Sequence, residues 1–173
     1  MITAATGAAV LAKLLSVPYT AGYLVGTLIG SLLPDIDEPK SFIGRRSFGI
    51  AHLIKQRFGH RGFTHSLVCW IIFSILVYVS IPLTNFACGL CFGYLFHILG
   101  DLFSKSSVPL FLPFSKLRPK MVWSYRTGGR LEKVIFFVVG GCFFYFLFVE
   151  QMVVDIVSSV VIEFESQLKS VIK

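Results

Sequence analysis

Residues 34–66 read PDIDEPKSFIGRRSFGIAHLIKQRFGHRGFTHS, a polar stretch between two apolar segments. It opens with Asp35 and Asp37 and closes with His60 and His65. An ionisable side chain beside lipid is costly unless it is paired with another charge or bound to a cation. Carboxylates and imidazoles held between hydrophobic segments therefore predict a polar site next to a membrane.

The composition around this stretch is that of a protein solvated largely by lipid. Of its 173 residues, 55% are hydrophobic and 14% are charged, whereas a soluble domain carries about 25% charged residues. The mean hydropathy is +0.77. The length predicts one domain over residues 1–173, and we expect this domain to be an integral membrane protein.

The apolar segments predict an all-α, multi-pass bundle of about five membrane-embedded helices, followed by a C-terminal amphipathic helix. The expected membrane helices cover residues 2–17, 19–33, 66–83, 86–103 and 134–149. Pro18 favours two short helices over one kinked helix in the first part of the chain. Gly22, Gly26 and Gly30 recur at four-residue spacing and predict the close approach of another helix. The amphipathic helix beyond residue 150 is expected either to lie in the membrane interface or to dock on the bundle.

Basic residues gather in two loops and carry most of the net charge of +7. The first loop holds Lys40, Arg45, Arg46, Lys55, Arg57 and Arg61, and the second holds Lys105, Lys116, Arg118, Lys120, Arg126, Arg130 and Lys133. Cytoplasmic loops collect Lys and Arg in this way, so both loops are expected to be cytoplasmic. Because apolar segments border both loops, contact with anionic lipid headgroups fits better than a nucleic-acid surface. We expect membrane lipids as partners and no nucleic acid.

The expected topology brings a third polar segment close to the segments at residues 35–37 and 60–65. His97 and Asp101 are four residues apart near the end of a membrane helix, so they project from one face of it. A short hairpin at residues 82–85 separates this helix from the preceding one, so the end at Asp101 and the start at Ser66 lie on the same side. Thr64 and Ser66 are expected to cap that preceding helix.

The converging side chains predict a metal site. Their imidazole and carboxylate groups suit zinc, manganese or iron better than calcium, and we expect one or two divalent ions, most simply zinc or manganese. Glu132 is a further candidate ligand, with a solvated surface position as the alternative. The predicted ligands are Asp35, Asp37, His60, His65, His97, Asp101 and Glu132.

Several motifs resemble the YdjM family of bacterial, LexA-regulated inner-membrane proteins, which are described as metal-dependent hydrolases. The matching stretches are LLPDIDEPKSFIGRR (32–46), FGHRGFTHSL (58–67), GYLFHILGDLFS (93–104), VPLFLPF (108–114) and RLEKVI (130–135). The resemblance implies a multi-pass inner-membrane hydrolase of the SOS response, with the Asp and His residues named above as its metal ligands. Members of this family usually carry a His in the first apolar helix, where this chain has Thr3, Thr6 and Gly7.

The resulting hypothesis is a hydrolase that acts at the cytoplasmic membrane face. A bound cation would lower the pKa of a water molecule, Asp37 or Asp101 would serve as general base, and Arg61 would neutralise charge on a phosphoryl oxygen. A ring of Arg and Lys at headgroup level favours an anionic, phospholipid-like substrate, so we expect phosphoester hydrolysis. Acyl-ester or amide hydrolysis would use the same activated water and stays open.

A different class of function also stays open on the sequence alone. The Asp and His cluster would then hold helices together or sense ions, with no catalysis. A structural metal site is coordinatively closed, whereas a catalytic one keeps an open position. A transporter is disfavoured, because the polar groups gather at one face and not at the midplane of the membrane.

Overall fold

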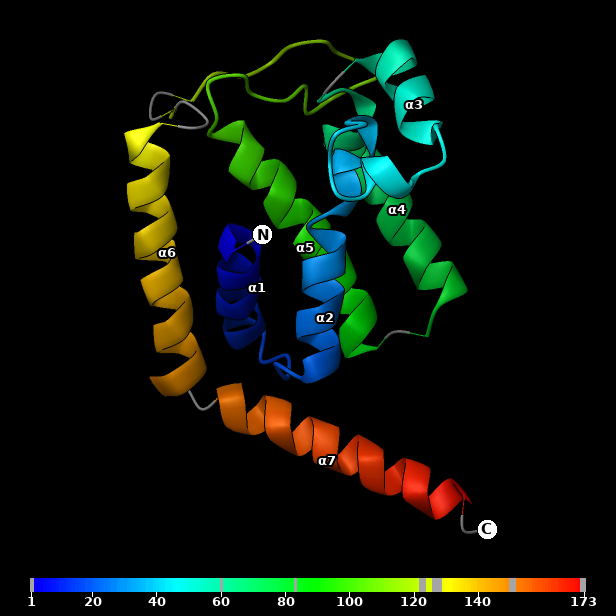
Figure 1. The fold of residues 1–173 in the computed structure, drawn as a ribbon, viewed down its shortest axis with the longest axis vertical. Coiled ribbons are helices and arrows are strands. Elements are labelled where there is room, and N and C mark those ends of the chain that lie inside the picture. The colour runs from blue at the N-terminus through cyan, green and yellow to red at the C-terminus, as the bar shows by residue number, and fades with distance from the viewer. Residues whose placement is uncertain are drawn as a thin grey trace.

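A computed structural model describes residues 2–59, 61–82, 84–121, 124–125, 129–149 and 152–171. Apart from one isolated bridge between Ser104 and Tyr125, regular structure in these ranges is helical, which confirms the predicted all-α class (Figure 1). The α-helices are α1 (Ile2–Leu14), α2 (Ala21–Gly30), α3 (Ile50–Phe58), α4 (Leu67–Ser80), α5 (Asn85–Leu102), α6 (Arg130–Val149) and α7 (Met152–Val171). Short 3-10 helices are η1 (Leu33–Asp37), η2 (Gly44–Arg46) and η3 (Phe63–His65).

The N-terminal apolar region folds as two helices, as Pro18 predicted. Thr20 is the N-cap residue of α2, and its side-chain oxygen accepts a hydrogen bond from the Tyr23 N–H at 3.2 Å. Ser66 caps α4 in the same way by accepting from the Cys69 N–H at 3.1 Å. Thr64 was predicted to share this role, but its hydroxyl instead donates to Asp37.

Glycines bring the backbones of α2 and α5 into direct contact. A Cβ atom added at Gly26 or Gly30 of α2 would overlap a carbonyl oxygen of α5. The relation is reciprocal, since a Cβ atom at Gly89 or Gly93 of α5 would overlap a carbonyl oxygen of α2. The close approach predicted from the glycine spacing is therefore confirmed, and its partner is α5.

Two helices in the described ranges are long and apolar enough to cross a membrane, namely α5 and residues Arg130–Phe148 of α6. Only 6% of the α6 segment is buried, against 39% of α5, so α6 presents most of its apolar surface outward. The apolar helices α1 and α4 are shorter, and the 14 residues of α4 extend about 21 Å, against a hydrocarbon core of about 30 Å. The expectation of about five membrane-embedded helices is not confirmed beyond α5 and α6.

The polar segments and the C-terminal helix lie at opposite ends of the molecule (Figure 1). The short helices η1 to η3, α3 and the loop after α5 form one end, and α6 leads from that end to α7 at the other. The Ala21 N–H at the start of α2 donates to the Ser159 hydroxyl of α7 at 3.1 Å. Helix α7 thus contacts the bundle while exposing apolar side chains such as Val154, Ile162 and Phe164.

Candidate metal centre

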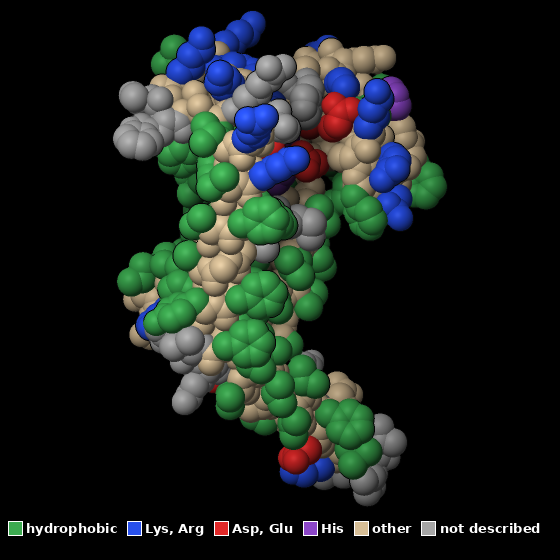
Figure 2. Space-filling model, turned by 60° about the vertical axis from the view of Figure 1, so that its left-hand side comes forward, with side chains coloured by type: hydrophobic (Ala, Val, Ile, Leu, Met, Phe, Trp, Pro, Cys, Tyr) green, Lys and Arg blue, Asp and Glu red, His purple; other side chains and the backbone are tan. Residues whose placement is uncertain are grey.

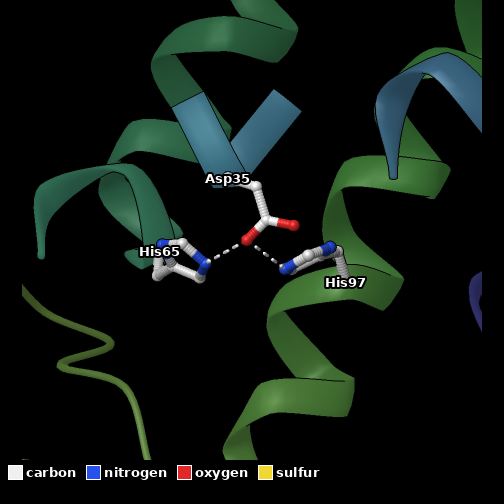
Figure 3. Close-up of side chains that lie close together, drawn as sticks. All are labelled: Asp35, His65 and His97. Carbon is white, nitrogen blue, oxygen red and sulfur yellow. Dashed lines mark ion pairs between the residues drawn. The ribbon is translucent and has the colours of Figure 1, made fainter. Parts of the chain in front are cut away.

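Three side chains from separate elements point toward one another at the polar end (Figure 3). Asp35 comes from η1, His65 from η3 and His97 from α5. The Oδ1 atom of Asp35 lies 3.7 Å from Nε2 of His65 and 3.6 Å from Nε2 of His97. One ligand atom from each residue lies within 4.8 Å of the others, as a shared metal ion requires.

Asp101 lies beside this group of three and faces both imidazoles. Its Oδ2 atom lies 3.5 Å from Nε2 of His65 and 3.8 Å from Nε2 of His97. These separations are longer than N–H···O hydrogen bonds of about 2.7–3.2 Å. Two ligand atoms at about 2.1 Å from a tetrahedral zinc ion lie about 3.4 Å apart. Two imidazoles and two carboxylates at this spacing fit a divalent cation of the zinc or manganese type.

The Nδ1 atom of each imidazole, on the side away from the centre, lies next to an oxygen atom of the protein. His97 Nδ1 lies 2.6 Å from the carbonyl oxygen of Ser31, to which it donates, and His65 Nδ1 lies 3.3 Å from Oδ2 of Asp37. Metal-binding histidines usually donate their second N–H to a carbonyl or carboxylate in this way, which fixes ring and tautomer. Both Nε2 atoms thereby face the centre.

Asp37 lies behind His65 and is fully buried. Its Oδ2 atom accepts from the Thr64 hydroxyl at 2.9 Å and from the Gly62 N–H at 3.3 Å. The sequence grouped Asp37 with the ligands and with the candidate bases. The structure places it on the Nδ1 side of His65, away from the facing ligand atoms, where it orients the ring.

The charges around the site favour a cation. Burial lowers the pKa of His65, but the nearby carboxylates of Asp35, Asp37 and Asp101 outweigh it and raise that pKa to about 9. Burial raises the pKa of Asp35, yet the nearby imidazoles of His65 and His97 bring it below its usual value. Carboxylate charge therefore dominates, and the pocket attracts positive charge.

Arg61 lies at the rim of the centre, bonded to the other oxygen of Asp101. Its Nη2 atom is 2.9 Å from Asp101 Oδ1, and its Nη1 atom donates to the hydroxyls of Ser104, at 3.0 Å, and of Ser106. Arg118 from the second basic loop donates to the Arg61 carbonyl oxygen at 3.3 Å. The two basic loops therefore meet beside the site, as their expected common face predicted.

An open cleft of about 290 Å³ adjoins the centre. Its lining includes Thr3, His97, Gly100, Asp101, Tyr125 and Glu132. Glu132, the seventh predicted ligand, thus lies on the wall of the cleft and outside the cluster formed by Asp35, His65 and His97. His60 lies outside the described residues. Figure 2 shows basic side chains at the upper end of this face, with acidic side chains recessed beneath them and hydrophobic side chains below.

Sequence reasoning missed some of the residues that build this site. The Ser31 carbonyl positions His97, yet a backbone acceptor leaves no mark in a sequence. Its place directly after Gly30 was the available signal, because the glycine spacing predicted a close helix partner there. Thr3 and Tyr125 line the cleft and carried no motif that set them apart.

The fold and the site together define a helical protein with two candidate membrane spans and an Asp/His cluster suited to a divalent ion. The chain belongs to the family described as YdjM inner membrane protein, whose family model matches residues 1–161. This membership confirms the resemblance found in the sequence motifs.

Individual relatives support the same placement. Proteins named "Inner membrane protein YdjM" from Escherichia coli (strain K12) and Shigella flexneri are each 39% identical over 109 residues, which cover 60% of this chain and 56% of the relative. "Uncharacterized protein YvsG" from Bacillus subtilis (strain 168) is 32% identical over 119 residues, covering 68% of this chain and 74% of that protein. The chain therefore spans little more than half the length of the first two relatives. No solved structure matches it.

Proposed function

We propose that this protein is a metal-dependent hydrolase of the bacterial inner membrane that cleaves a phosphoester of an anionic, phospholipid-like substrate at the cytoplasmic face. One observation carries the proposal. The Nε2 atoms of His65 and His97 each lie 3.5–3.8 Å from a carboxylate oxygen of Asp35 and from one of Asp101, and Asp35, His65 and His97 bring one ligand atom each within 4.8 Å of one another. Such a donor set has little use in packing and suits a divalent cation.

The position of this cluster at the wall of a cleft supports catalysis over a purely structural role. His97 and Asp101 contribute both to the cluster and to the cleft lining. A catalytic site keeps one side open to substrate, whereas a structural site is closed by protein ligands. A substrate in the cleft would therefore lie directly beside the ligand atoms.

A bound zinc or manganese ion would supply Lewis acidity and a water of lowered pKa. The chain itself does the positioning. Asp37 and the Ser31 carbonyl hold the two imidazoles by their Nδ1 atoms. Arg61 offers a positive charge at the rim, where a phosphoryl group of the substrate would lie. We assign proton transfer to Asp101 or Glu132, because both carboxylates line the cleft and Asp37 is buried behind His65.

We further propose that α5 and α6 cross the membrane, with α1, α2 and α4 embedded beside them. The hydrophobic character of α1 and α4 supports their insertion despite their shorter length. Both basic loops lie at the same end as the metal centre (Figures 1 and 2). The preference of Lys and Arg for cytoplasmic loops assigns this end to the cytoplasm.

A non-catalytic role is the second candidate, and one observation favours it. The four ligand atoms come from η1, η3 and α5, so a bound ion would cross-link segments that are distant in sequence. In this alternative the bound ion stabilises the contact between these segments, and the cleft is not an active site.

The test uses the full chain purified in detergent and loaded with zinc or manganese. Metal content and hydrolysis of phosphatidylglycerol and of bis(4-nitrophenyl) phosphate are measured for the wild type and for Asp35→Asn and His97→Gln. We expect both variants to lose metal affinity by more than about 100-fold, beyond the roughly 10–100-fold typical of residues that only orient a ligand, and to lose turnover with it.

His52→Gln is the matched control, because His52 lies on α3 and is exposed. It is expected to bind metal and to turn over substrate like the wild type. Metal bound without turnover of either substrate would reject the hydrolase and favour the structural alternative. Wild-type protein that takes up neither ion would reject both.

A further inference from the structure

A second hollow of about 370 Å³ continues from the cleft toward the apolar part of the molecule. It shares Thr3, Gly100, Tyr125 and Ile135 with the cleft. The rest of its lining is hydrophobic and comes from α5 and the residue after it: Phe96, Leu99 and Phe103. We call this hollow the apolar groove. Its volume lies within the range of about 300–1,000 Å³ typical of ligand sites.

The arrangement of α5 explains why a polar cleft and an apolar groove adjoin. Phe96, Leu99 and Phe103 are spaced three and four residues apart and form one stripe of the helix. His97 and Asp101 form the neighbouring stripe. The stripe from Phe96 to Phe103 extends about 10 Å along the helix axis. The ring of Phe96 rests on α1 at Gly7, where a Cβ atom would overlap it.

The surface around the groove is apolar. Its outer wall includes Ile135 of α6, and α6 is a candidate membrane span whose side chains are almost all outside the core. Neighbouring residues such as Phe136 and Phe137 are exposed. Hydrophobic side chains cover the surface below the recessed acidic groups (Figure 2). If α6 crosses the membrane as proposed, hydrocarbon has direct access to the groove from the side.

The cleft end of the groove carries cations at headgroup level. Arg61 is bonded to Asp101 at one edge. Lys133 lies at the other edge, where it lines a hollow together with Glu132 and Phe136, two residues that also line the cleft. A phosphate group placed between these edges would have a positive charge on each side.

We propose that one hydrocarbon chain of a bilayer phospholipid enters sideways between α1, α5 and α6 and lies in the apolar groove. The phosphate of the same lipid then lies in the cleft beside His97 and Asp101. This inference rests on the proposed function and names its substrate class and its route of entry. A water-soluble phosphoester would use the cleft alone, and the groove would have no occupant.

Gly100 offers a direct way to close the groove. It lies on α5 and lines both the cleft and the groove. A Cβ atom there would meet only Thr3 Oγ1, at 3.8 Å, within the described residues, so a larger side chain enters the groove without displacing backbone. Gly100→Leu is therefore expected to fold and to fill the groove, and Leu also favours helix more than Gly does.

The experiment reconstitutes the full chain in vesicles of phosphatidylethanolamine and phosphatidylglycerol that contain phosphatidylglycerol with a diazirine on one acyl chain. Adducts formed by illumination are mapped to residues by mass spectrometry. In the wild type we expect adducts at Phe96, Leu99 and Phe103, and also at Phe144 on the exposed surface of α6. Gly100→Leu is expected to reduce the groove adducts at least fivefold and to leave the Phe144 adduct unchanged.

Gly141→Leu is the matched control, because it places the same side chain on α6 where, among the residues that the structure describes, no atom would lie within 4 Å of an added Cβ. Ile135→Trp narrows the groove from the opposite wall and provides a second variant. Groove adducts that persist in both Gly100→Leu and Ile135→Trp, or that are absent from the wild type, would overturn the inference.

Metal content and turnover separate this inference from the proposed function. If the groove is the substrate route, Leu99→Trp, which enlarges a residue that lines the groove and not the cleft, keeps its metal and its hydrolysis of bis(4-nitrophenyl) phosphate while losing hydrolysis of phosphatidylglycerol. Groove adducts in a protein that hydrolyses neither substrate would support lipid binding and reject the hydrolase. Unchanged phosphatidylglycerol hydrolysis after the groove adducts are lost would reject the groove as the substrate route.

Discussion

At the scale of single residues, Asp37 shows how the fold can orient a candidate metal ligand with a side chain that lies outside the candidate centre. The carboxylate is buried and accepts hydrogen bonds from Thr64 and Gly62 while it faces Nδ1 of His65. Tyr94 of α5 supports the same segment by donating to the Thr64 carbonyl oxygen at 2.7 Å. The orientation of His65 therefore depends on a small network that does not itself face the centre.

Asp37→Asn is expected to weaken metal binding by roughly 10–100-fold, the usual effect of removing a partner that orients a ligand. The amide keeps the size of the side chain but removes its charge and changes the hydrogen-bonding pattern at His65 Nδ1. Competition with a chelator measures the affinity. Asp155→Asn on the exposed surface of α7 is the control and should match the wild type. An Asp37→Asn protein with wild-type affinity would contradict the orienting role.

The candidate ligand residues were more predictable than their geometry. His97 and Asp101 are placed by helical spacing alone, and Asp35 and His65 stand out because charged groups are scarce in this chain. The role of Asp37 was not predictable, because a carboxylate two residues from Asp35 reads as a ligand in a sequence. Its position on the far side of His65 depends on the turn of η1 and on the contact with η3.

At the scale of elements, the contact between α2 and α5 positions the centre. The Ser31 carbonyl, at the C-terminal end of α2, reaches His97 on α5 because glycines remove the side chains that would hold the two helices apart. Hydrophobic pattern predicted both helices. It did not predict their separation, which depends on backbone-to-backbone contact between segments about 60 residues apart.

Gly30→Ala is expected to destabilise the protein by about 1–3 kcal/mol, the usual cost of overpacking, and to lower metal affinity as well. The added methyl group would overlap the Leu90 carbonyl oxygen, so the helices must separate and Ser31 must move away from His97. Thermal unfolding and chelator competition measure the two effects. Gly22→Ala is the control, because its nearest neighbours lie 3.8 Å away. Equal stability of the two variants would contradict the tight contact.

At the scale of the whole molecule, charge divides the protein into two ends. The basic loops and the metal centre occupy one end, and α7 occupies the other (Figure 1). Helix α7 carries Asp155, Glu163 and Glu165 against Lys169. Helix α6 joins the two ends with 20 residues, which extend about 30 Å and match the hydrocarbon core. This arrangement predicts that α7 lies on the external face of the inner membrane.

Cysteine labelling tests this orientation. In a variant with the four native cysteines replaced by serine, Glu165→Cys on α7 should react with a membrane-impermeant maleimide in intact spheroplasts. Phe48→Cys, in the exposed segment before α3, should react only after lysis. The two positions are matched in being exposed in the protein, so the difference reports the side of the membrane. The reverse pattern would place the metal centre outside the cytoplasm.

The α2–α5 contact has a consequence for how the protein responds to its membrane. The two helices fit in one register, because sliding by a residue would press side chains onto the opposing carbonyl oxygens. The positions of Ser31 and His97 relative to one another along the two helix axes are therefore set by the helix contact and not by the thickness of the bilayer. We therefore expect a thinner or thicker bilayer to change the tilt of α6, of which only 6% is buried, and to leave the spacing of the candidate ligand atoms unchanged.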